Sequence, residues 1–82
     1  MSEAGHDFHT LFPDHGRALY ALKLGNQHFR LLADEHHGLE ARIQRVEAGL
    51  DALSDEELEE LKKRRLAVLD AVSALIANEE KA

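Results

Sequence analysis

The stretch LSDEELEELKKRR, residues 53–65, places five acidic and four basic residues around Leu58 and Leu61. Ser54 precedes Glu57 by three residues. At this spacing the serine hydroxyl can accept a hydrogen bond from the Glu57 backbone N–H while the Glu57 carboxylate reaches back to Ser54. The acids that follow crowd the first turns, where the helix dipole favours negative charge. The stretch therefore predicts a new helix that begins just after Ser54.

The segment before this stretch carries apolar residues at alternating spacings of three and four, which is the seam of a coiled coil. The seam consists of Phe29, Leu32, His36, Leu39, Ile43, Val46, Leu50 and Leu53. We expect a long helix over residues 26–52, with Asn26 as its N-cap and Gly38 inside it. Gly38 and Gly49 weaken this helix, so an end near Ala48 is the alternative to one at residue 52.

The helix that follows, expected over residues 55–78, carries two apolar stripes instead of one. The first stripe is Leu58, Leu61, Arg65, Val68, Val72 and Leu75, and the second is Leu66, Leu69, Ser73 and Ile76. A turn near Ser54 makes the two long helices antiparallel and covers the first stripe with the seam. Arg65 then reaches Glu40 or Glu47 across the hairpin. The second stripe is left for the N-terminal helix or for a second chain.

The N-terminal part is less regular. Residues 1–10 show no helical repeat and are predicted to form a flexible tail. A short helix over residues 13–24 begins at Pro13, whose fixed φ suits a first helical position. Gly25 is expected to end this helix in a left-handed conformation.

The predicted fold is all-α, with a short N-terminal helix followed by a long antiparallel helical hairpin in one domain over residues 1–82. Dimerisation into a four-helix-bundle-like core is the favoured way to cover the second stripe. The 82 residues include no cysteine, which excludes disulfides and thiolate metal sites, and the net charge is −6. No stretch approaches a membrane span, and the first ten residues do not resemble a signal peptide, so we expect a cytoplasmic protein.

Several segments resemble one known family in order and spacing. They are LFPD from residue 11, NQHF from residue 26 with a leucine three residues after the phenylalanine, LEARIQRVE from residue 39 and SDEELEELKKRRL from residue 54. Over about residues 9–76 the chain resembles the YdcH-like family of small bacterial proteins of unknown function. The resemblance implies a short helix followed by an antiparallel hairpin, and a larger aromatic residue at the position of His36. It implies no activity and no ligand residues.

Six histidines raise the question of a metal site. His6 and His9 have an H-x-x-H spacing with His15 nearby, but the first two lie in the predicted tail. His36 and His37 point about 100° apart on a helix. A zinc site needs three or four converging ligands. We therefore predict no metal and no cofactor.

Lys62, Lys63, Arg64 and Arg65 form a basic cluster of the kind that contacts phosphates. The five acids just before it largely cancel its field at long range, and no aromatic residues alternate with the bases. Overall acidity also opposes nucleic-acid binding. Nucleic acid is therefore the second hypothesis for this cluster.

The sequence also lacks a nucleophile elbow, and its acids follow helix periodicity, so we predict that the protein is not an enzyme. The favoured hypothesis is an adaptor or regulator that binds itself and a protein partner through Leu66, Leu69 and Ile76.

The seam position of His36 generates a prediction about pH. A buried imidazole loses stability when it is protonated unless Glu35 or Glu40 compensates, whereas a ring turned to solvent does not. We expect His36→Leu to raise the melting temperature more at mildly acidic than at mildly alkaline pH, as measured by thermal unfolding. An equal effect at both pH values would contradict a role for protonation.

Overall fold

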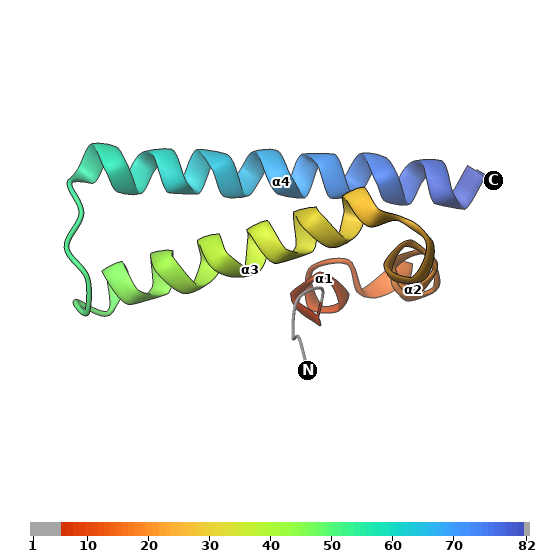
Figure 1. Ribbon diagram of the computed structural model, residues 1–82, viewed down its shortest axis with the longest axis horizontal. Coiled ribbons are helices and arrows are strands. Elements are labelled where there is room, and N and C mark those ends of the chain that lie inside the picture. Colours follow the sequence, from red (N-terminus) through yellow and green to blue (C-terminus); the bar gives the residue numbers. More distant parts are fainter. Residues whose placement is uncertain (1–5, 82) are drawn as a thin grey trace.

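The structure is a computed structural model that describes residues 6–81, with side chains from Phe8 onward. Its elements are α1 (His6–Leu11), the 3-10 turn η1 (Pro13–His15), α2 (Gly16–Gly25), α3 (Gln27–Glu47) and α4 (Asp55–Lys81). Figure 1 shows α3 and α4 as an antiparallel hairpin, with α1 and α2 beside α3 and away from the connecting loop. The predicted all-α hairpin with a short N-terminal helix is confirmed.

The first half of the chain reversal is the end of α3. Gly49 has a φ of 79°, the left-handed region in which glycine carries no steric penalty. The Leu50 N–H donates to the Arg45 carbonyl at 2.8 Å and the Gly49 N–H to the Val46 carbonyl at 3.1 Å. These two bonds form a Schellman motif, which satisfies carbonyls that the helix end leaves free. The helix therefore ends at Glu47 with Ala48 as its C-cap, five residues before residue 52 and in agreement with the alternative end near Ala48.

The second half of the reversal is the start of α4. The Glu57 N–H donates to Ser54 Oγ at 3.1 Å, and the Ser54 N–H donates to Glu57 Oε1 at 3.3 Å. This is the capping box predicted from the sequence, and it starts α4 at Asp55 as expected. At its other end α4 reaches Lys81, three residues beyond the predicted residue 78.

The joint between α2 and α3 is a single extended residue. Asn26 has φ −131° and ψ 106°, and its side chain accepts a hydrogen bond from the Phe29 N–H at 2.8 Å. The predicted N-cap is confirmed. The left-handed ending predicted at Gly25 was wrong, because Gly25 is the last residue of α2 and Asn26 changes the chain direction instead.

The N-terminal segment differs most from the prediction. Residues 6–11 form α1, where a flexible tail was expected through residue 10, and residues 1–5 lie outside the described part of the chain. Pro13 begins η1, and the α-helix itself starts only at Gly16 rather than at Pro13. Proline disfavours helical backbone in the preceding residue, so α1 cannot continue through Phe12 into α2.

Phe8 is the reason that α1 is ordered. Its side chain is fully buried, with its ring centroid 5.7 Å from that of Phe29 and 5.0 Å from that of His36. Phe12 packs edge-on against Phe8 at 6.4 Å. The six-residue helix is far too short to be stable alone, so this aromatic cluster holds it against α3.

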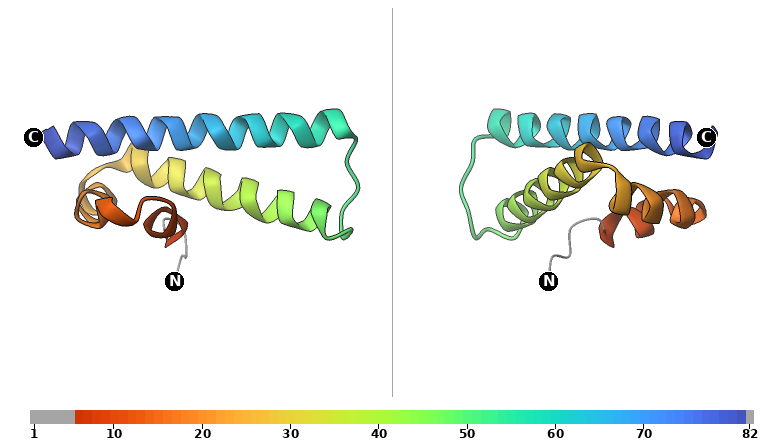
Figure 2. Two further views of the ribbon diagram at one scale, coloured as in Figure 1. Left: turned by 180° about the vertical axis from the view of Figure 1, so that it is seen from behind. Right: turned by 45° about the vertical axis from the view of Figure 1, so that its right-hand side comes forward.

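The core is unevenly distributed along the hairpin. It joins Phe8, α2, α3 as far as Leu39 and the second half of α4, and its α4 members are Val68, Val72 and Ile76. Toward the loop, Val46, Leu53, Leu58 and Leu61 are only partly buried and Leu50 is 67% exposed. Figures 1 and 2 show α3 and α4 diverging toward that loop. The apolar side chains at the loop end of the hairpin are therefore incompletely buried.

The burial of Phe8 gives the first structural prediction. Phe8→Ala removes a fully buried ring, and such truncations cost about 3–5 kcal/mol, so we expect a loss of this order in the free energy of unfolding. The measurement is urea unfolding followed by circular dichroism. Thr10→Ala, at an exposed position on the same helix, is the matched control. Equal stability of the two variants would show that α1 does not belong to the folded unit.

Candidate interaction surface

The two apolar stripes of α4 differ in how far the rest of the chain buries them. In the first stripe Val68 and Val72 are buried, and Leu61 and Leu75 are partly buried against the same core. In the second stripe Ile76 is only 3% exposed and belongs to the core inside the chain. Ile76, which the sequence analysis assigned to partner binding, therefore does not lie on the free surface.

Leu66 and Leu69 are the part of the second stripe that stays accessible. Leu66 is 60% exposed, and Leu69 is half-buried with one side against the core. They lie one turn apart, and the exposed Ser73 continues the same stripe. The hollow between α2 and α4 lies nearer the C-terminal end of α4, at Glu79 and Glu80, and the middle of the stripe stays exposed at Leu66 among the described residues. Leu66 and Leu69 are hereafter the α4 patch.

Arg64 of the basic cluster is paired across the hairpin. Its Nε donates to Glu35 Oε2 at 2.6 Å, and this hydrogen bond together with the carboxylate charge raises the pKa of the guanidinium. The pair joins α3 to α4 at the surface.

Two further bases of the cluster are also paired. Arg65 Nη1 donates to Glu40 Oε1 at 3.0 Å, as the sequence predicted, and both side chains are partly buried. Lys62 Nζ lies 3.4 Å from Glu47 Oε2. Lys63 has no ion pair among the described residues. The cluster is therefore largely neutralised by acids of α3.

His36 is a core residue. Its ring is 2% exposed, packs against Phe8, and has Nε2 3.9 Å from Glu40 Oε2. The alternative of a ring turned to solvent is excluded by this burial. The effect of its protonation stays a prediction.

The other histidines do not form a metal centre in the part of the chain that the structure describes, where no three potential ligands converge. His15 Nδ1 instead contacts Glu80 Oε2 at 2.7 Å and ties η1 to the end of α4. The side chain of His6 lies outside the described residues.

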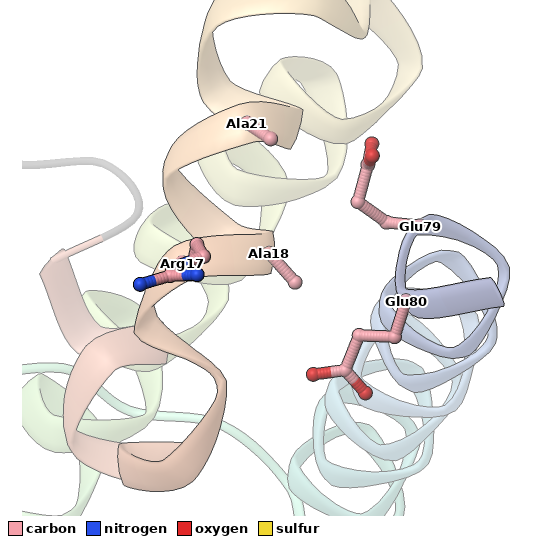
Figure 3. Close-up of a pocket in the computed structure, with 5 residues that line it drawn as sticks. All are labelled: Arg17, Ala18, Ala21, Glu79 and Glu80. Atoms are coloured by element: carbon pink, nitrogen blue, oxygen red, sulfur yellow. The ribbon is translucent and has the colours of Figure 1, made fainter. Parts of the chain in front are cut away.

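A hollow of about 440 Å³ lies between α2 and α4, above this contact. Figure 3 shows Ala18 and Ala21 of α2 facing the carboxylates of Glu79 and Glu80, with the Arg17 guanidinium turned away from both acids. The hollow has a floor of small apolar side chains and an acidic rim. Its walls come from the packing of α2 on α4, so it reflects how these two helices meet.

Two further grooves run along the hairpin between α3 and α4. The groove at the loop end, of about 330 Å³, is lined by Arg42, Leu53, Glu57, Glu60 and Leu61. The groove nearer the middle, of about 390 Å³, is lined by Leu32, Glu35, Arg64, Ala67 and Val68. The sequence analysis missed the loop-end groove because it kept Leu50 and Leu53 inside the seam of a longer α3.

No helix among residues 6–81 is both long enough and apolar enough to cross a membrane. Comparison with known families gives one match: the family described as "Protein of unknown function (DUF465)" matches residues 29–76, more than half of the chain. No curated protein and no solved structure matches the chain.

The ion pairs of the basic cluster lead to a stability prediction. Arg65→Ala removes a partly buried guanidinium and the stem that packs beneath it, so we expect a loss of about 1 kcal/mol or more in unfolding free energy. Arg64→Ala removes a highly exposed pair, which solvent screens, and should leave the melting temperature nearly unchanged. Thermal unfolding of both variants makes the comparison. A larger loss for Arg64→Ala would mean that the Glu35 pair holds the helices together.

Proposed function

Because the chain belongs to the DUF465 family of proteins of unknown function, its role has to be inferred from its surfaces, and we propose that it is a helical protein-interaction module. In this proposal it acts in the bacterial cytoplasm as an adaptor or regulator that associates with itself and with a protein partner. It performs no catalysis and needs no cofactor.

The observation that carries the proposal is the exposure of Leu66 in the middle of α4. A leucine that is 60% exposed, with Leu69 half-buried beside it, offers apolar area on a rigid helix. Helical proteins recognise one another through such anchors at spacings of three and four residues. The partner that fits is an apolar or amphipathic protein helix laid along the α4 patch.

The pairing of the basic cluster supports a protein partner over nucleic acid. Contacts with phosphates require Lys and Arg side chains that can exchange counterions for the backbone. Three of the four bases already have carboxylate partners on α3. Phosphate binding would have to break these pairs in a chain with a net charge of −6.

The test is site-specific photo-crosslinking of the full chain in its own cells. With the crosslinking residue at Ser73, on the same stripe as the α4 patch, we expect covalent protein adducts that Leu66→Glu abolishes. Leu66 is the better position for substitution because Leu69 also touches the core. A crosslinker at Ala41, an exposed position on α3, is the control and should give none of these adducts.

Adducts that survive Leu66→Glu, or that occur equally at Ala41, would overturn the role of the α4 patch. Retention of nucleic acid that weakens steeply with salt and is lost on neutralising Lys62, Lys63, Arg64 and Arg65 would favour the second hypothesis instead.

A further inference from the structure

One face of the hairpin has no cover from α1 or α2, the other helices of the described residues. On α4, Glu57, Glu60, Arg64 and Ala67 are spaced three or four residues apart, so they lie along one side of the helix. These residues line the two grooves between α3 and α4, and no residue of α1 or α2 lines either groove. This side of the hairpin, with both grooves, is hereafter the open face.

The N-terminal layer packs on a different side. His15 contacts Glu80, and at about 100° per residue Glu80 points about 160° away from Glu60 and Arg64 around α4. The η1 turn therefore contacts nearly the opposite side of α4, and α2 faces α4 at Glu79 and Glu80, outside both grooves. The open face cannot be covered by the described part of α1 or α2 without undocking them.

At its loop end, the open face has apolar side chains that are incompletely buried. Leu53 and Leu61 are half-buried in the floor of the groove, and Leu50 is 67% exposed beside it. Apolar area of this kind, flanked by charged residues, is typical of a surface that another protein covers. The 21 residues of α3 span about 32 Å beside α4, and two packed helices are about 20 Å across. The resulting footprint, about 640 Å², approaches the roughly 800 Å² that each partner contributes to a typical stable complex.

The charges on the two walls of the loop-end groove decide what fits there. Arg42 stands on the α3 wall, and Glu57 and Glu60 stand on the α4 wall. A nucleic acid or an anionic membrane would meet the two acids, and a cationic peptide would meet the arginine. A second copy of the same surface, turned so that its α3 faces this α4, places opposite charges together at both walls.

We propose that the open face is the self-association surface of this protein. It is covered by a second copy related by a two-fold axis that runs along the hairpin. Each α3 then lies over the α4 of the other copy, Arg42 of each chain meets Glu60 of the other, and the loop-end leucines of both chains meet on the axis. Such an interface is isologous, so every contact occurs twice. This inference rests on the proposed function and assigns its self-association to a face distinct from the α4 patch.

Both charged residues can form the new contact. Arg42 is half-exposed and its Nε lies 3.5 Å from Asp51 Oδ2, whereas Arg45 Nε holds the same oxygen at 2.9 Å. Asp51 thus keeps a partner when Arg42 turns away. Glu60 takes part in no ion pair among the described residues and does not belong to the capping box, which uses Glu57.

Charge reversal tests the proposal on the full chain. The wild type should have twice the 9.2 kDa mass of one chain by light scattering and sedimentation. Arg42→Glu and Glu60→Arg should each raise the dimer dissociation constant by about tenfold or more, because like charges then face each other twice. The variant with both substitutions restores opposite charges at both contacts and should dimerise like the wild type.

Asp34→Arg on α3 and Glu59→Arg on α4 are the matched controls, because each reverses the charge of an exposed residue that lines neither groove, and both should remain dimeric. Circular dichroism of every variant checks that the helices are kept. A monomeric wild type, a loss of dimer in the controls, or no recovery in the double variant would overturn the proposal. Photo-adducts at Ser73 that still depend on Leu66 would then show that partner binding stands without this dimer.

Discussion

The fold depends on the reversal of the chain between α3 and α4, which two local backbone motifs impose. A left-handed glycine closes α3 with two hydrogen bonds to its last carbonyls, and the capping box at Ser54 opens α4. Neither motif requires a distant contact, so both helix ends are specified before the helices meet. Only after this reversal can the apolar seam of α3 be covered by α4, because neither helix buries its apolar side alone.

The position of the Schellman motif also shapes the surface. It ends α3 at Glu47, so Leu50 and Leu53 are removed from the seam and placed in the loop. The partners that these two leucines would have had on α4 are left half-buried, and the helices separate toward the loop. The same hydrogen bonds that stabilise the hairpin therefore leave its loop end incompletely packed. The apolar floor of the loop-end groove is a direct consequence of where the helix stops.

The sequence predicted the elements whose signals are local or periodic. The seven-residue repeat located both long helices, Asn26 and Ser54 located two helix starts, and the Arg65 to Glu40 contact followed from the antiparallel register. Phe8 could not be found in this way, since α1 has fewer than two turns and no repeat, and its order comes from a ring buried against Phe29 and His36. The ion-pair partner of Arg64 could not be predicted from the sequence either. Arg64 contacts Glu35, which lies 29 residues earlier in the chain, so this contact exists only when the hairpin is closed.

The docking of α1 and α2 explains why the two candidate surfaces are different in kind. On the side that they cover, α4 buries Ile76 and keeps only a small apolar patch around Leu66. On the other side no helix among the described residues lies over the hairpin, and the exposed feature at the loop end is a groove between α3 and α4 with opposite charges on its walls. A small patch on one helix suits a partner that can be exchanged, since few anchors set the affinity. A long two-helix face with self-complementary charges suits a permanent contact, because its area and its symmetry allow each favourable interaction to be made twice. The short N-terminal helices thus do more than complete the core: by occupying one side of the hairpin, they determine which side is left for a second chain.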